Sequence, residues 1–194
     1  IQQNSIKRML AYSSVAHAGY MLLAMPVMSG DSMYAIMMYL VMYLFMNLGA
    51  FFVVITVQNK TGGETFDDYK GLGWEMPMIG IVMTIFMVSL TGLPPTAGFI
   101  GKFYIFASLI KGGNEFYWLV MIGGINSVIS LFYYLRVVKV MYFEGESHEK
   151  IVQPPTVMAA LLLATAIPTV LLGVYWTPIA DWVQRSLIFF IQTL

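Results

Sequence analysis

The chain has 194 residues, of which 59% are hydrophobic and only 10% are charged, and its mean hydropathy is +0.76. Soluble domains carry about 25% charged residues, so we expect lipid to be the solvent for much of this surface. A formal net charge of zero gives no indication of a nucleic-acid partner, and the absence of cysteine excludes disulfides and thiolate metal sites. Because the chain opens with Ile1 and a polar segment typical of a loop between helices, we expect a fragment or processed chain that forms one membrane domain over residues 1–194.

Five apolar stretches predict an all-α fold, a polytopic transmembrane helix bundle. A helix rises about 1.5 Å per residue, so stretches of this length can cross a hydrocarbon core of about 30 Å. The amphipathic tail over 178–194 is expected to lie in the membrane interface or to pack on the bundle. The expected spans cover about residues 6–28, 34–57, 77–110, 116–143 and 156–176.

The third stretch, 77–110, is too long for one straight span, since a continuous helix of that length would extend about 50 Å. Its middle, 91–98, reads TGLPPTAG. Pro94 and Pro95 remove two backbone donors, and the flanking glycines permit dihedral angles that a helix does not use. We therefore expect one discontinuous helix, with half-helices at about 77–91 and 96–110 and a break near 92–96.

The basic residues outside the membrane predict the orientation of the chain. With five spans, seven of them fall on one side and two on the other, which places the richer side in the cytoplasm, or in an organelle matrix or stroma. The first set is Lys7, Arg8, Lys60, Lys70, Arg136, Lys139 and Lys150, and the second is Lys111 and Arg185.

Lys102 is the strongest functional candidate. On a helix it lies about 13 Å from Lys111, close to the bilayer centre, where an ionisable residue is costly and typical of ion or proton pathways. The alternative is a lysine that pairs with a carboxylate to lock two helices, but no carboxylate of this chain is expected at comparable depth. The half-helix that opens at Pro95 places a partial positive charge within two turns of Lys102, and Gly98 and Gly101 leave room for water or a neighbouring backbone. Broken helices with ionisable groups at the break recur in transporters.

His17 is the second candidate and is also expected near the middle of the membrane. Histidine titrates close to physiological pH and can relay protons, and Ser13 and Ser14 lie one turn away on overlapping faces. The alternative is a neutral histidine that donates to a backbone carbonyl of another helix, and the sequence leaves both open. No Walker loop, dinucleotide fingerprint or clustered set of metal ligands is present, so we expect no cofactor and no metal in this chain.

Several segments resemble the antiporter-like, proton-translocating membrane subunits of respiratory complex I. The run SIKRMLAYSS at 5–14, followed by HAGY at 17–20, is similar to a motif of these subunits, and LPPTAGFIGKFY at 93–104 resembles their discontinuous helix with its central lysine. The segments YKGLG at 69–73 and YYLR at 133–136 are most similar to the N subunit, the counterpart of mitochondrial subunit 2.

The resemblance implies a C-terminal portion of a proton-translocating subunit of NADH:quinone oxidoreductase, without redox catalysis of its own. Lys102 and His17 would transfer protons, and Lys7, Ser13 and Ser14 would support them. The implied partners are other membrane-arm subunits, the lipid bilayer, protons and internal water, while NADH, FMN, iron–sulfur clusters and quinone would bind other subunits. The implied location is a bacterial inner (plasma) membrane, with an organelle inner membrane or a thylakoid as alternatives. A subunit of a multisubunit Na⁺/H⁺ antiporter and a non-transporting scaffold are the other functions considered.

Overall fold

The computed structural model describes residues 3–145 and 153–192, with side chains described as far as residue 188, and the described chain consists of helices and the turns that join them. The all-α fold expected from the sequence is therefore confirmed. The helices are α1 (Ile6–Ala24), α2 (Gly30–Thr61), α3 (Leu72–Glu75), α4 (Pro77–Thr91), α5 (Ala97–Gly112), α6 (Tyr117–Phe143), α7 (Thr156–Val174) and α8 (Thr177–Gln192), with 3-10 turns η1 (Met25–Val27), η2 (Phe66–Tyr69) and η3 (Asn114–Phe116).

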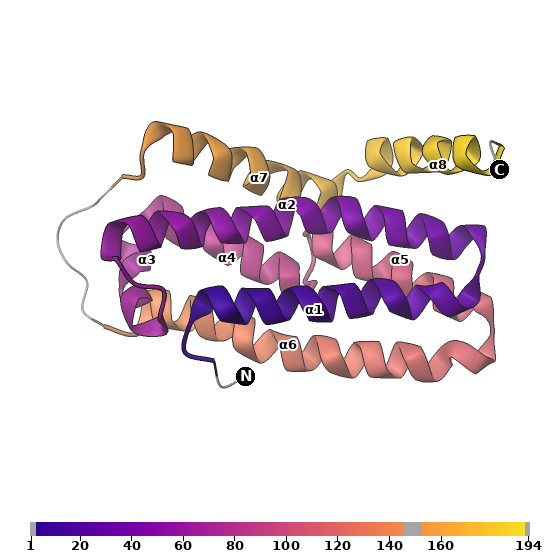
Figure 1. Cartoon of the computed structure of the whole chain (residues 1–194), viewed down its shortest axis with the longest axis horizontal. Helices are drawn as coiled ribbons and strands as arrows, with labels where there is room; N and C mark the ends of the chain where they lie inside the picture. Colours follow the sequence, from indigo (N-terminus) through magenta and orange to yellow (C-terminus); the bar gives the residue numbers. More distant parts are fainter. Residues whose placement is uncertain (1–2, 146–152, 193–194) are drawn as a thin grey trace.

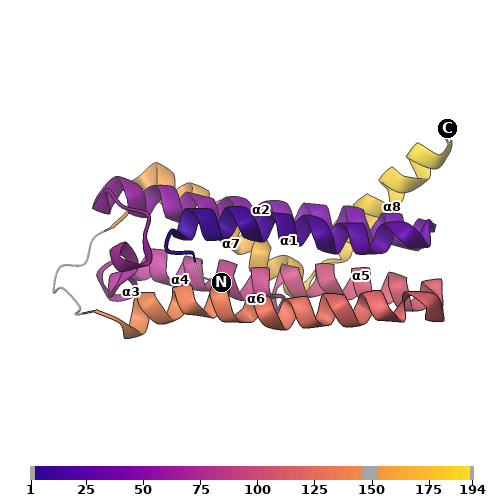
Figure 2. The same ribbon diagram turned by 60° about the horizontal axis from the view of Figure 1, so that its bottom comes forward.

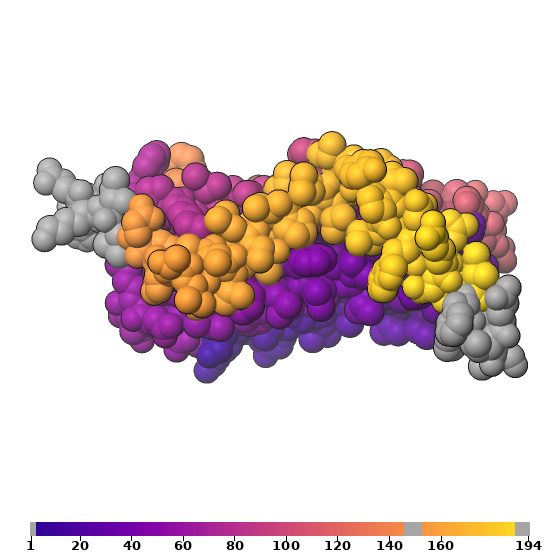
Figure 3. All heavy atoms as spheres, turned by 90° about the horizontal axis from the view of Figure 1, so that it is seen from above, coloured from indigo at the N-terminus to yellow at the C-terminus, as the bar shows by residue number. Residues whose placement is uncertain are grey.

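The long helices lie side by side in one bundle. Helix α2 runs along the whole bundle, α1 and α6 run along most of it, and α4 and α5 follow one another end to end beside them (Figure 1). Helix α7 packs across α2, α4 and α5, and α8 leaves the bundle at an angle (Figure 2). Seen from above, α7 and α8 lie over α2 (Figure 3). This arrangement brings α1, α5 and α6 together around the break between α4 and α5.

Local signals shift the helix ends from the positions expected along the sequence. Helix α1 stops at Ala24, because a 3-10 turn that contains Pro26 follows it and Met28 takes a left-handed conformation, φ 47°. Ser29 then starts α2 early through a capping box with Ser32, in which each side chain bonds the other residue's backbone N–H. At its far end α2 continues to Thr61, where Gly62 closes it with φ 76°.

Three helical segments in the described residues are long and apolar enough to cross a membrane: Gly30–Thr61, Asn114–Phe143 and Thr156–Val174. A bent pair, Phe66–Glu75 with Pro77–Thr91, would add a fourth if it counted as one span, although the helix direction bends by 118° between its two parts. The chain is thus an integral membrane protein with a discontinuous helix. The expected number of five crossings stays a prediction, as does the orientation, and the expected polar loop at 144–155 lies partly outside the described residues.

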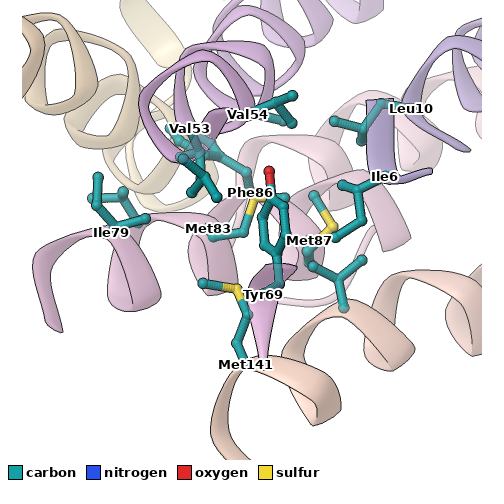
Figure 4. Packing of buried hydrophobic residues seen from close by; sticks show 14 of the residues in the cluster. Ile6, Leu10, Val53, Val54, Tyr69, Ile79, Met83, Phe86, Met87 and Met141 are labelled. Carbon is teal, nitrogen blue, oxygen red and sulfur yellow. The ribbon is translucent and has the colours of Figure 1, made fainter. Parts of the chain in front are cut away.

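A hydrophobic core fills the end of the bundle where α1 begins. The turn η2 inserts the fully buried ring of Tyr69 among side chains of four helices, as Figure 4 shows. Ile6 comes from α1, Val53 from α2, Phe86 from α4 and Met141 from α6. This core fixes the ends of α1, α4 and α6 relative to one another, and thereby the position of the break farther along.

Candidate functional site

The break between α4 and α5 lies where the prolines predict it. Helix α4 ends at Thr91, Gly92 follows with φ 88°, and α5 begins at Ala97, so the expected half-helices and their linker near 92–96 are confirmed. The two ends are tied together, because the backbone N–H of Gly98 donates to Ser89 Oγ at 3.1 Å. A Cβ atom at position 98 would collide with the backbone carbonyl of Ser89, so only glycine allows this approach.

Lys102 is buried, with 5% of its surface exposed, and its side chain points back along α5 toward the break. Its Nζ donates to the carbonyl oxygen of Thr91 at 2.7 Å and to Ser127 Oγ on α6 at 3.2 Å. The same atom lies 4.5 Å from the centroid of the Tyr20 ring on α1, within the range of a cation–π contact. A carbonyl, a hydroxyl and an aromatic face therefore surround the ammonium on three sides.

The carbonyl at Thr91 changes the electrostatic interpretation of the break. The sequence places Lys102 near the start of the second half-helix, where the backbone carries partial positive charge. The side chain instead reaches the C-terminal end of α4, where unpaired carbonyls carry partial negative charge. The first half-helix thus stabilises the ammonium, and the nearby start of α5 is the smaller influence because Nζ is in direct contact with the Thr91 carbonyl.

No ion pair of Lys102 is found in the described part of the chain. The described ion pairs lie at the ends of the bundle instead. A lysine that locks two helices would face a carboxylate, whereas Lys102 faces only neutral groups among the described residues. The ion pairs are Lys7–Glu64, Lys60–Glu75, Lys70–Asp67, Lys111–Asp31 and Lys139–Glu144.

His17 is held by two tyrosines from two other helices. Its Nδ1 lies 2.7 Å from the hydroxyl of Tyr39 on α2, and its Nε2 lies 2.9 Å from the hydroxyl of Tyr134 on α6. Its exposed fraction is 1%. A neutral imidazole has one donor and one acceptor nitrogen, so one tyrosine donates to the ring and the other accepts from it. The partners are hydroxyl groups, not the backbone carbonyl considered in the sequence analysis.

Tyr20 stands between the two candidates. Its ring centroid lies 6.0 Å from that of His17 and 4.5 Å from Lys102 Nζ, and no hydrogen bond joins His17 to Lys102 in the described structure. The hydroxyl of Tyr20 lies 2.8 Å from Ser127 Oγ. The site therefore has two polar groups of residues, one around Lys102 and one around His17, with an aromatic ring between them.

The other candidate residues fall in different places. Ser13 is buried and its Oγ has no hydrogen-bond partner among the described residues, while Ser14 Oγ donates to the carbonyl of Leu10 in its own helix. Lys7 lies at the end of the bundle in an ion pair with Glu64 at 3.5 Å, away from the break.

Of the residues expected at the break, Pro94 and Pro95 form its linker, and Gly101 sits against the ring of Tyr39. The contact partners Tyr20, Tyr39, Tyr134 and Ser127 were not singled out as candidates. Tyr20 could have been found, since it follows His17 by one turn on the same helix face, but the others come from distant segments.

Together, the fold and the site define a membrane helix bundle with a discontinuous helix and a buried lysine held at its break. Residues 1–130 match the family described as "NADH:quinone oxidoreductase/Mrp antiporter, TM", and the chain belongs to this family. The resemblance drawn from the motifs is confirmed.

One relative and two solved structures show how the match is distributed. NADH-quinone oxidoreductase subunit N 2 of Sorangium cellulosum is 52% identical over 188 residues, which cover 96% of this chain and 37% of the relative. A chain of respiratory complex I from Thermus thermophilus is 28% identical with a TM-score of 0.75, over 93% of this chain and 40% of that one. A chain of the Mrp complex from Dietzia sp. DQ12-45-1b shares the fold, with a TM-score of 0.83 and 17% identity over 96% of this chain and 43% of that one. The chain therefore spans well under half the length of the proteins it matches.

Proposed function

We propose that this chain is part of a proton-translocating membrane subunit of NADH:quinone oxidoreductase, in which Lys102 takes up and releases protons. The observation that carries the proposal is the buried ammonium at the helix break, held by neutral acceptors. A carboxylate partner would fix the charge, whereas a carbonyl and a hydroxyl leave the protonation of Lys102 responsive to charges elsewhere in the protein. Similarity to proteins named subunit N supports this choice within the family.

In this proposal, the chain moves protons and the redox chemistry occurs elsewhere. NADH, FMN, iron–sulfur clusters and quinone would bind other subunits, and quinone reduction there would alter the charge near Lys102. Other membrane-arm subunits, the surrounding lipid and internal water would be the partners of this chain. A bacterial inner membrane is the proposed location, in keeping with the bacterial relatives.

His17 would be a second proton-transfer group. The imidazole bridges two tyrosine hydroxyls, so a proton that arrives at one ring nitrogen can leave from the other. Ser13 is buried beside this group, has no hydrogen-bond partner in the part of the chain that the structure describes, and would hold water near the group. Tyr20 separates His17 from Lys102, so transfer between them would require water or a movement of that ring.

The test is proton pumping by the assembled complex that carries Lys102→Ala or Lys102→Arg in the full-length subunit. Arginine keeps the positive charge but does not release its proton at physiological pH. We expect both variants to assemble, as judged on native gels, and to lose quinone-linked pumping by about tenfold or more. The matched control is Lys139→Ala, which removes an exposed lysine from a surface ion pair at the end of the bundle.

Normal pumping by both Lys102 variants in an assembled complex would refute the role of Lys102 and favour a scaffold. The shared fold with the Mrp complex also keeps a Na⁺/H⁺ antiporter subunit as the competing function. Transport that depends on sodium and continues without quinone turnover would favour that alternative.

A further inference from the structure

Two hollows flank Lys102 on either side of α6. One lies between α5 and α6 and has a volume of about 500 Å³. Its lining is mostly apolar, with Phe103 and Ile110 among its residues, and its polar members include Lys102, Ser127 and Lys111. The other side carries two adjoining pockets between α1 and α6, of about 340 and 380 Å³, which share Asn126. Each is many times larger than the roughly 30 Å³ that a water molecule occupies in the liquid, so each is large enough for water beside its polar groups. We call the pair of pockets between α1 and α6 the α1–α6 groove.

Two hydroxyl groups form the partition between these hollows. Ser127 lines the pocket between α5 and α6, and Tyr20 lines the α1–α6 groove. Ser127 Oγ lies 3.2 Å from Lys102 Nζ and 2.8 Å from the hydroxyl of Tyr20. The hydroxyl of Tyr20 in turn lies 3.3 Å from the carbonyl oxygen of Gly123, which also lines the groove. An unbroken series of hydrogen bonds therefore leads from the ammonium to the wall of the groove.

The direction of each hydrogen bond follows from the number of donors. Tyr20 has one hydroxyl hydrogen, which it donates to the carbonyl of Gly123. The contact between Tyr20 and Ser127 must then be made by the Ser127 hydrogen. This leaves the Ser127 oxygen to accept from Lys102 Nζ. All three donors point the same way, from Lys102 toward the groove, which is the order that a proton relay requires.

We propose that the hydroxyls of Ser127 and Tyr20 relay protons between Lys102 and water in the α1–α6 groove. Lys102 Nζ gives a proton to Ser127 Oγ as Ser127 passes its own hydrogen to the Tyr20 oxygen. Tyr20 releases its hydrogen to a groove water, once its O–H bond has turned from the Gly123 carbonyl to that water. The result is a neutral Lys102 and a protonated water, and the two hydroxyls must rotate back before the next transfer.

The two hollows extend over different lengths of the bundle. The pocket between α5 and α6 reaches Lys111, at the end of the bundle where α5 turns into α6. The groove runs from Leu23, near the end of α1, to Gln3, which precedes α1 in the other half of the bundle. Its floor carries polar groups of Ser13, Asn126 and Tyr133. Lys102 thus touches one hollow directly and the other through two hydroxyls, so the relay joins a hollow at the Lys111 end to a groove that also continues into the other half of the bundle.

The relay rests on the proposed function of Lys102, so its test must separate the two. In the full-length subunit of the assembled complex, we would measure quinone-linked proton pumping for Tyr20→Phe, Ser127→Ala and Ser127→Thr. Phenylalanine keeps the ring beside Lys102 and removes only the hydroxyl, and threonine restores the hydroxyl that alanine removes. The matched control is Tyr69→Phe. It removes a buried tyrosine hydroxyl that lies in the core at the end of the bundle and has no hydrogen-bond partner within residues 3–145 and 153–188.

We expect Tyr20→Phe and Ser127→Ala to pump about tenfold more slowly or worse, and Ser127→Thr and Tyr69→Phe to stay within about twofold of the unmodified complex. Unimpaired pumping by Tyr20→Phe or by Ser127→Ala would overturn the relay. If Lys102→Ala lost pumping in the same experiments, the proposed function of Lys102 would still stand. If Tyr20→Phe does not assemble, the comparison of alanine with threonine at position 127 decides the matter. Equal losses in those two variants would also overturn the relay, because the hydroxyl would then not be the group that matters.

Discussion

A hydrogen atom in place of a side chain at position 98 lets α5 approach the end of α4. A Cβ atom there would meet the carbonyl group of Ser89, which belongs to the backbone and cannot turn aside. We predict that Gly98→Ala destabilises the protein by about 1–3 kcal/mol, as overpacking does elsewhere. The measurement is the midpoint of thermal unfolding in detergent.

Gly124→Ala is the matched control for that substitution. Nothing lies within 4 Å of a Cβ atom at position 124, which is inside α6. Alanine in a helix interior is favoured over glycine by about 0.5–1 kcal/mol, so the midpoint should stay or rise. If the two variants had the same unfolding midpoint, the close approach of α5 to α4 would not be the reason for glycine at position 98.

A second prediction concerns the exposed pair Asp67 and Lys70 in the turn before α3. Lys70 Nζ lies 2.6 Å from Asp67 Oδ1, and its hydrogen bond lowers the pKa of Asp67 below the ordinary value. The contribution of the pair to stability is therefore present above the ordinary pKa of the carboxyl group and is lost as the pH falls through the lowered pKa. We expect Lys70→Met to raise the pKa of Asp67, which NMR titration of labelled aspartate would follow. An unchanged titration curve would show that the pair does not form in solution.

At the scale of the helices, Ser89 connects the two halves of the discontinuous helix. Its side chain is buried and accepts the hydrogen bond of the Gly98 N–H. Ser89→Ala would leave that N–H buried without its partner, at a cost of about 1–3 kcal/mol. We predict a lower unfolding midpoint and, because α5 carries Lys102, slower proton transfer. The unfolding midpoint of Ser89→Thr, which retains a hydroxyl, should fall between those of Ser89→Ala and the unmodified protein. A midpoint for Ser89→Ala equal to that of the unmodified protein would contradict the prediction.

How far the sequence predicts these elements depends on how local their signals are. Two adjacent prolines and the glycines beside them were sufficient to locate the break, because each acts on its own backbone. The capping box at Ser29 and Ser32 is equally local, although the apolar stretch alone suggested a later start for α2. The end of α1 was missed because a 3-10 turn keeps the same apolar composition as a helix.

The partners within the site depend on tertiary packing and could not be obtained in this way. Lys102 and His17 stood out because a titratable side chain in an apolar stretch is unusual. Ser127 and Tyr134 carry hydroxyls of a common kind, and only the packing of α6 against α1 and α5 selects them. The direction in which Lys102 points also depends on packing, since its length allows it to reach either end of the break.

At the scale of the whole molecule, the described basic side chains in ion pairs lie at the two ends of the bundle, more of them at one end than at the other. The ion pairs of Lys7, Lys60 and Lys139 lie at the end where α1 begins, and that of Lys111 lies at the other. We predict that the first end faces the cytoplasm, as the excess of basic residues indicates.

Because the sequence contains no cysteine, single cysteines can report this orientation without removing native thiols from this segment. Thr61→Cys should react with a membrane-impermeant maleimide from the cytoplasmic side only, and Glu115→Cys from the opposite side only. Labelling of both from the same side would contradict the expected number of crossings between them. Labelling of each from the reverse side would keep that number and invert the orientation.

The break between α4 and α5 also bears on how stable this protein can become. In a continuous helix the carbonyl of Thr91 would accept the N–H four residues on, but that residue is Pro95, which has none. The carbonyl is therefore free to hold Lys102 at 2.7 Å. Replacing the prolines with good helix formers would favour a continuous helix, in which this carbonyl accepts a backbone N–H and no longer binds Lys102. Selection for thermal stability alone should thus work against the proposed proton transfer by Lys102. A stabilised variant found by such a screen should be checked first for substitutions at positions 94 and 95.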